Sequence, residues 1–174
     1  MRKRKEGRGL IKLKTRKLLL RPFVRSDLDD LAQINSASET RGFGWVRTMD
    51  NETTALFLQK WIEEYKRGLG HLAMIYEPDS ALIGHCGLTE QGGRVVLAYA
   101  LHKDYWCRGL APEACNAILE YGFGVLRVEE IWTETQAKNY AWRSMMEKLG
   151  MTLRETKLTN SGVEVHYAAS RVNY

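Results

Sequence analysis

The chain has 174 residues, of which 44% are hydrophobic and 27% charged, and this composition is typical of one globular domain with a sizeable core. No apolar run approaches the roughly 18 residues that a membrane-spanning helix needs, and the N-terminus lacks the apolar stretch of a signal peptide. We therefore expect a cytoplasmic protein without a membrane contact.

The net charge of +5 is concentrated at the N-terminus. Residues 1–17 contain nine Lys or Arg and one Glu, whereas residues 18–174 carry a net charge of −3. This asymmetry predicts a basic arm over residues 1–16 and a single domain over residues 17–174. Such an arm is suited to contact a polyanion, such as nucleic acid or a ribosome. The alternative is a solvated tail without a partner, because no aromatic residues interleave the charges.

The three cysteines are Cys86, Cys107 and Cys115. They are odd in number and lack C-x-x-C spacing, so they predict neither a disulfide framework nor a zinc site. We expect them to be buried or half-buried free thiols and expect no metal in the protein.

The first half of the chain is predicted to alternate between strands and helices. Strands are predicted over residues 17–23, 71–76 and 81–89, and helices over residues 26–35 and 51–66. Thr53 or Thr54 is the expected cap of the second helix. Its apolar residues available for burial are Leu56, Leu58, Trp61, Ile62 and Tyr65. The loop Arg41–Trp45 carries aromatic residues that suit docking onto the core as well as substrate contact.

The second half centres on a strand, a glycine turn and a helix. Residues 95–101 are apolar and β-prone, as in a strand covered on both faces. A helix is predicted from about Gly109, with Pro112 in its first turn. Its apolar face comprises residues 115, 118, 119, 122, 123 and 126. A strand over residues 127–135, a helix over 139–149 and a hairpin of 151–158 with 163–169 follow. The pattern predicts a single mixed α/β domain.

The turn before the predicted helix at Gly109 is a candidate anion site. A helix start leaves about four backbone N–H groups without intrahelical partners, and the helix dipole adds roughly half a positive charge there. Small residues at 109 and 111 let a pyrophosphate approach that backbone. The alternative is a tight turn without a ligand, since neither of the better-known phosphate-binding patterns is present.

Two segments resemble the signature segments of the GNAT superfamily of acyl-CoA-dependent N-acyltransferases, and within it the RimJ/RimL type. The segment YWCRGLAPEA (residues 105–114) meets seven of ten positions of the first signature, Arg108 conservatively, while Cys107 replaces a small residue. The segment QAKNYAWRSMMEKLGM (residues 136–151) matches the second through Asn139 and the run from Glu147 to Gly150. The resemblance covers nearly the whole chain outside the basic arm.

The resemblance implies a GNAT-like domain with a mixed, mostly antiparallel sheet whose central strands splay apart, flanked by helices. It implies that acetyl-CoA enters between the strands at 95–101 and 127–135 and meets their free backbone groups. The implied cofactor-binding residues are Tyr99, Ala100, Leu101, Trp106, Cys107, Arg108, Gly109, Leu110, Ala111, Pro112 and Asn139. For Asn139, a plain helix cap is an equal alternative.

The sequence departs from the family at the positions of its acid and base. Met146 stands where many members have a tyrosine, and Trp142 where RimJ/RimL-type proteins have a serine. Ser144 does not replace that serine, because two residues along a helix is a turn of about 200°. A glutamate often found early in the fourth strand corresponds to Val96.

Three side chains remain as candidate bases, namely His85, Glu90 and His102, and the first two are the predicted catalytic residues. The resemblance implies direct transfer of an acetyl group from acetyl-CoA to a primary amine, on a protein N-terminus or a small molecule. An amine of low pKa suits a site without an evident base, since far more of it is neutral near pH 7.4. The alternatives are another acyl donor, such as succinyl-CoA, and a non-catalytic acyl-CoA-binding or ribosome- or nucleic-acid-associated module.

Overall fold

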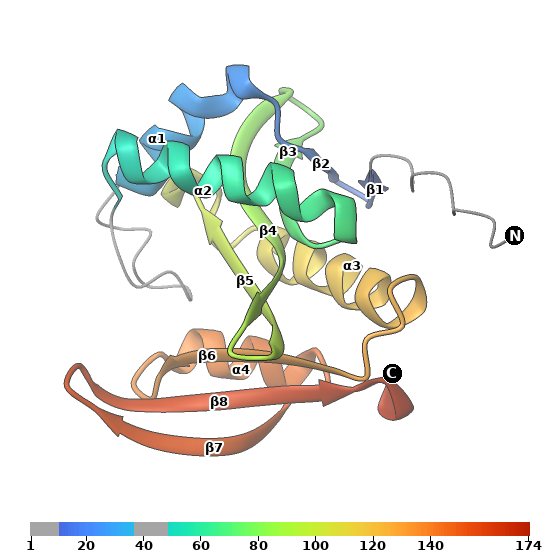
Figure 1. The fold of residues 1–174 in the computed structure, drawn as a ribbon, viewed down its shortest axis with the longest axis vertical. Coiled ribbons are helices and arrows are strands. Elements are labelled where there is room, and N and C mark those ends of the chain that lie inside the picture. The colour runs from blue at the N-terminus through green and yellow to red at the C-terminus, as the bar shows by residue number, and fades with distance from the viewer. Residues whose placement is uncertain (1–10, 37–48) are drawn as a thin grey trace, which may run out of the picture.

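The computed structural model describes residues 11–36 and 49–174. Within them, one eight-stranded sheet has the order β1-β2-β3-β4-β5-β6-β8-β7 (Figure 1). The strands are β1 (Leu13–Lys14), β2 (Leu18–Pro22), β3 (Gly70–Tyr76), β4 (Ala81–Gln91), β5 (Arg94–Leu101), β6 (Glu130–Gln136), β7 (Thr152–Thr159) and β8 (Gly162–Ser170). The helices are α1 (Leu28–Ser36), α2 (Asn51–Glu64), α3 (Leu110–Gly124) and α4 (Tyr140–Lys148), with short 3-10 turns η1 (Arg25–Asp27), η3 (Tyr65–Arg67), η4 (Lys103–Tyr105) and η5 (Arg171–Asn173).

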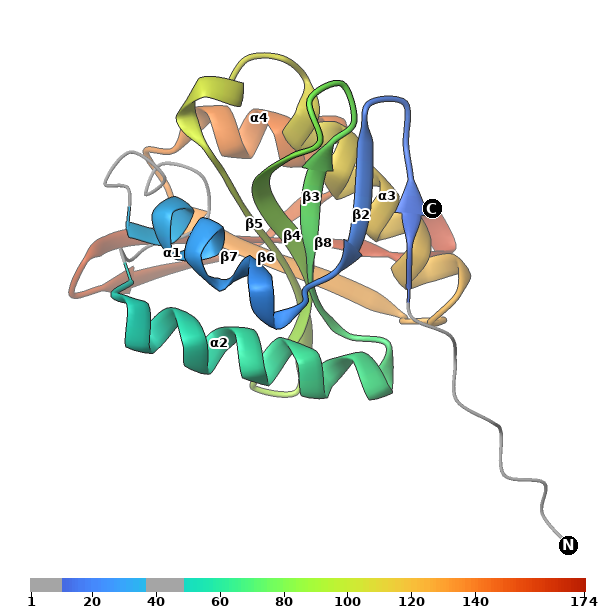
Figure 2. The same cartoon turned by 90° about the horizontal axis from the view of Figure 1, so that it is seen from above.

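The helices cover the two faces of the sheet in pairs. Figure 2 shows α1 and α2 on one side and α3 and α4 on the other. The larger apolar core lies on the α3 and α4 side and includes Leu97, Cys115 and Ile131. A smaller core on the α1 and α2 side is built around Trp61, whose ring stacks on Phe23. The predicted single domain of mixed α/β class is therefore confirmed.

The sheet is antiparallel except between β5 and β6, which are its only parallel neighbours among the described strands. These two strands pair only at Val95 with Ile131 and at Val96 with Trp132. Beyond Trp132 they diverge, and Figure 1 shows β6, β8 and β7 running across the direction of β4 and β5. The splay that the resemblance implied is therefore present in the sheet.

Several local predictions need correction. Leu13 and Lys14, which the sequence analysis did not assign to a strand, form β1 and pair with β2. Asp50 caps α2, with its carboxylate accepting a hydrogen bond from the Thr53 N–H at 2.7 Å, in place of the predicted threonines. Leu56 is 64% exposed because it lies on the outer face of α2. Residues 1–10 of the predicted basic arm and the loop Arg41–Trp45 lie outside the described residues.

Candidate active site

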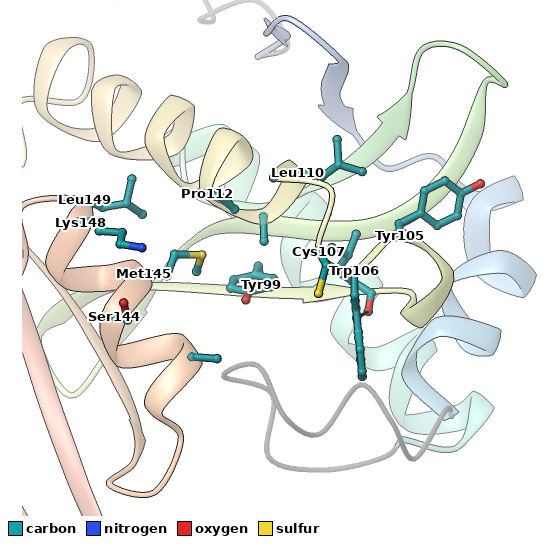
Figure 3. A pocket seen from close by; sticks show the side chains of 14 residues that line it. Tyr99, Tyr105, Trp106, Cys107, Leu110, Pro112, Ser144, Met145, Lys148 and Leu149 are labelled. Atoms are coloured by element: carbon teal, nitrogen blue, oxygen red, sulfur yellow. Dashed lines mark hydrogen bonds between the residues drawn. The ribbon is translucent and has the colours of Figure 1, made fainter.

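A cavity of about 410 Å³ opens where the end of β5 meets the start of α3 and one face of α4. Figure 3 shows Tyr99 of β5 at its centre, with the turn after β5 and the side chains of α4 at opposite ends. Its lining residues are Tyr99, Leu101, Tyr105, Trp106, Cys107, Gly109, Leu110, Ala111, Pro112, Ala141, Ser144, Met145, Lys148 and Leu149. The site is thus a mainly apolar cleft that ends at a helix N-terminus.

The turn before α3 is shaped by two residues in the left-handed region. Gly109 has φ 75° and is the N-cap of α3, and Cys107 has φ 57°. Gly109 has no Cβ, and its position is open on that side, so a ligand can approach the backbone closely. The Trp106 indole N–H donates to the Leu101 carbonyl at 2.9 Å, which ties the turn to the end of β5. The first turn of α3, where backbone N–H groups have no intrahelical partners, therefore borders the cavity.

Glu113 anchors the start of α3 to the N-terminal strands. Its carboxylate accepts hydrogen bonds from the Thr15 hydroxyl at 2.5 Å and the Lys17 N–H at 2.7 Å. The Lys17 ammonium donates to the Arg108 carbonyl at 3.3 Å, which brings a positive charge to the turn. A carboxylate in the first helical turn also complements the helix dipole. This long-range anchor holds the opening in shape.

The two faces of α4 have different roles. Trp142 and Met146 are buried, and the Trp142 ring stacks on Tyr99 with a centroid distance of 4.7 Å. The opposite face, with Ala141, Ser144 and Lys148, lines the cavity. The turn of about 200° that separates Ser144 from Trp142 therefore places the serine hydroxyl on the cavity wall (Figure 3). The angle that excludes Ser144 from the position of the family serine thus also brings it to the cavity.

Eight of the eleven predicted cofactor-binding residues line the cavity, and Ala100, Arg108 and Asn139 do not. Ala100 faces the other side of the sheet, in register with His85. The Arg108 guanidinium lies over the Tyr105 ring, 5.0 Å from its centroid. The Asn139 carboxamide accepts from the Trp142 N–H at 3.2 Å and donates to Thr135 at 3.1 Å, so it caps α4.

The lining residues that the sequence reasoning missed are Tyr105, Ala141, Ser144, Met145, Lys148 and Leu149. Tyr105 belongs to η4, and the spacing of the other five, three and four residues apart in or next to α4, was the available signal. Burial raises the pKa of the Tyr99 phenol, so this side chain stays protonated within the cavity wall. Cys107 is exposed, whereas the sequence predicted a buried or half-buried thiol.

His85 does not have the environment of a catalytic base. It is fully buried under α1 and α2, where its Nδ1 lies 2.7 Å from Nδ1 of His71 and its Nε2 lies 3.3 Å from the Asn35 carboxamide oxygen. Burial lowers the pKa of His85 to about 3 and that of His71 well below its usual range. An imidazole with such a pKa does not accept a proton from an amine near neutral pH. The prediction of His85 as a base is therefore corrected.

Glu90 lies at the far end of β4 from His85. It is in register with Val95, whereas His85 is in register with Ala100, and its carboxylate forms an ion pair with Arg67. The structure does not bring the two predicted catalytic residues together, and neither lines the cavity. His102 accepts a weak hydrogen bond from the Asp104 N–H at 3.4 Å, outside the cavity wall.

The fold and the cavity, with splayed strands leading to a helix N-terminus, define an acyl-transfer domain of the GNAT type. A family model described as acetyltransferase (GNAT) domain matches residues 17–152. The chain therefore belongs to the GNAT acetyltransferase family, and it is an acetyltransferase enzyme.

Individual relatives agree with this family. The chain is 25% identical over 132 residues to the uncharacterized N-acetyltransferase p20 of Bacillus licheniformis, covering 73% of this chain and 74% of the relative. A GNAT-family acetyltransferase structure from Bacillus anthracis superposes with a TM-score of 0.81 at 24% identity, covering 93% and 99% of the two chains. The structure of a spermidine N-acetyltransferase from Vibrio cholerae, in complex with CoA and spermine, superposes with a TM-score of 0.79 at 15% identity. The match covers 91% of this chain and 98% of that one.

Residues 11–36 and 49–174 offer neither a helix that could span a membrane nor a cluster of metal ligands. No helix in these ranges has the length and apolar character to span a bilayer. The same ranges hold no group of three His, Cys, Asp or Glu side chains placed to bind a metal ion.

Proposed function

We propose that the protein transfers the acetyl group of acetyl-CoA to a primary amine, on a protein N-terminus as in the RimJ/RimL type or on a small molecule. The observation that supports this most is the cavity that leads from the open edge of β5 to the N-terminus of α3. GNAT enzymes use acetyl-CoA as donor, and the residues present fit it. The apolar walls suit the pantetheine arm, and the opening at Gly109 suits the pyrophosphate.

In the proposed complex, backbone groups on the open edge of β5 make polar contacts with the donor. Beyond Val96, no described strand pairs with this edge, although the Thr133 hydroxyl still donates to the Leu97 carbonyl at 2.9 Å. Backbone groups near Tyr99 and Leu101 bind the amides of the pantetheine arm as an added strand would. A backbone N–H there polarises the thioester carbonyl as the amine attacks it.

The cavity wall also holds groups for the polar ends of the donor. The Lys148 ammonium, on the cavity face of α4, adds a positive charge to the wall that faces the bound donor. The Ser144 hydroxyl is a proton donor within the cavity wall that can serve the departing thiolate. The non-catalytic module is not favoured, because the chain belongs to an acetyltransferase family and its relative carries the name N-acetyltransferase.

The test is calorimetric titration with acetyl-CoA, followed by a thiol-release assay with mixed amines and short peptides with free N-termini. We expect micromolar binding and thiol release that depends on the amine. Repeating the assay with succinyl-CoA measures the choice of acyl donor. Binding without turnover on any amine would contradict the enzymatic proposal, and the absence of binding would contradict the assignment of the cavity.

A further inference from the structure

Glu134 lies where the sheet opens, on the face away from the cavity. It is two residues past Trp132, the last residue of β6 that pairs with β5. Its neighbours Thr133 and Thr135 are buried on the α3 and α4 side, and alternation along the strand turns Glu134 to the opposite face. The Glu134 side chain is 53% exposed. A carboxylate therefore borders the gap on the α1 and α2 side of the sheet.

His166 of β8 is in register with Glu134 and shares that face. Its Nδ1 lies 3.6 Å from Glu134 Oε2, a distance that a small side-chain rotation converts to a hydrogen bond. His166 is only 8% exposed, and its Nε2 is buried without a hydrogen-bond partner. A buried nitrogen without a hydrogen-bond partner lowers the free energy of unfolding by about 1–3 kcal/mol. In this pair, the Glu134 carboxylate orients the His166 imidazole, and Nε2 of the ring has no hydrogen-bond partner.

Acidic side chains lie around His166 on this face. Glu155 of β7 is in register with His166, and Glu164 lies two residues before it on the same face of β8. The cations on this side are engaged with Glu155, since Arg94 binds its carboxylate at 2.7 Å and Lys157 at 2.9 Å. Glu134 is the carboxylate closest to the imidazole among the described ion pairs.

We propose that His166 is the base that takes the proton of the acceptor amine, directly or through one water, and that Glu134 positions it. This inference rests on the proposed function. The donor occupies the cavity on one face of the sheet and the amine enters from the other, so that the two meet in the gap between β5 and β6. Direct transfer requires the donor and the amine to be bound at the same time, with the nitrogen next to the thioester carbonyl.

In the proposed reaction, a neutral amine displaces the thiolate of CoA from the acetyl group. The amine lone pair attacks the thioester carbonyl, so that the C–N bond forms, and the C–S bond then breaks with its electron pair on sulfur. The proton lost by the nitrogen goes to Nε2 of His166, and Glu134 stabilises the imidazolium. The thiolate takes a proton from water, directly or through the Ser144 hydroxyl, which regains its proton from water, and His166 returns its proton to solvent. No oxidant, reductant or metal is needed.

The experiment measures kcat, KM and acetyl-CoA affinity for the full chain and four variants, with the amine identified in the thiol-release assay. We expect His166→Gln to lower kcat about 100-fold or more, the range of general-base catalysis, with acetyl-CoA affinity within twofold. Glu134→Gln, at an exposed position, should lower kcat about tenfold, and Glu134→Asp should recover most of the loss. The matched control is Glu130→Gln, four residues earlier on the same face of β6, which should stay within twofold.

A second readout separates a base from a structural residue. In His166→Gly, added imidazole should raise kcat at least tenfold, and it should leave the unaltered protein unchanged. Turnover of His166→Gln within threefold of the unaltered protein would overturn the proposal, as would a loss in the glycine variant that imidazole does not reverse. If His166→Gln fails to fold, full activity of Glu134→Gln overturns it. Absence of turnover by the unaltered protein would instead be a failure of the proposed function.

Discussion

The two faces of the sheet near the gap between β5 and β6 differ in the chemical character of their side chains. On the α3 and α4 side, the site is made of backbone and apolar side chains, with the turn at Gly109 and the stacked pair of Tyr99 and Trp142. On the α1 and α2 side, the pair of His166 and Glu134 borders the gap, and the histidine pair lies further away on β3 and β4. One face is thus suited to hold a large donor, and the other to handle protons.

The α1 and α2 face itself contains two kinds of histidine site. His71 and His85 satisfy each other, with Asn35 and the Trp61 ring enclosing them. His166 has an unused nitrogen and an acidic neighbour at the gap. All three imidazoles are buried, so the residue type and burial alone do not identify a base, and the partners of each ring nitrogen make the difference.

The largest expected effect on acetyl-CoA binding comes from placing a bulky side chain in the cavity on the α3 and α4 side. Ala111→Trp places an indole in the cavity that Ala111 lines, so acetyl-CoA affinity should fall at least 100-fold, or about 2.7 kcal/mol. Calorimetry measures this, and Glu120→Trp, exposed further along α3, is the control for added bulk. Retained affinity in Ala111→Trp would show that the donor binds elsewhere and would remove the contrast between the two faces.

Acid should destabilise the protein through the histidine pair. Burial depresses the pKa of both His71 and His85 in the folded state, so below about pH 6.5 the unfolded chain binds protons that the folded chain does not. Stability therefore falls as the pH is lowered from 6.5, by about 2 kcal/mol per histidine at pH 5. Urea unfolding between pH 7 and pH 5 measures this window, which lies above the range where most carboxylates titrate.

A variant sharpens this test. In His71→Gln the amide can keep a hydrogen bond to His85, and one titrating group is removed, so the slope of stability against pH should be about half. An unchanged slope in this variant would mean that other groups cause the acid sensitivity.

A smaller effect is expected at Cys107, whose φ of 57° is unfavourable for a residue with a side chain. Cys107→Gly should raise the free energy of unfolding by about 1 kcal/mol, since relief of the left-handed strain exceeds the entropic cost of glycine. Arg127→Gly is the matched control, with φ 60° at a position outside the cavity lining. Destabilisation by both changes, measured by urea unfolding, would contradict the strain argument.

Much of the donor site could be predicted from the sequence because its signals are local. The change of period after Tyr105, the glycine at 109 and the proline at 112 give the strand, turn and helix directly. The proton-handling face depends on register between distant strands, and Glu134 and His166 lie 32 residues apart. Nothing in the local sequence shows that α1 and α2 bury His85, or that Arg67 engages Glu90.

The smallest effect is expected for Ser144→Ala on the cavity wall. The leaving thiol has a pKa near 8.5, so water protonates it at little cost, and kcat should fall less than about threefold. Thiol release under saturating acetyl-CoA and amine measures this change, and an unchanged acetyl-CoA affinity shows that the cavity is intact. A fall of 100-fold would assign proton handling to the donor face as well, and the division between the two faces would then be wrong. A small effect, beside a large one at His166, would place the difficult proton transfer at the amine.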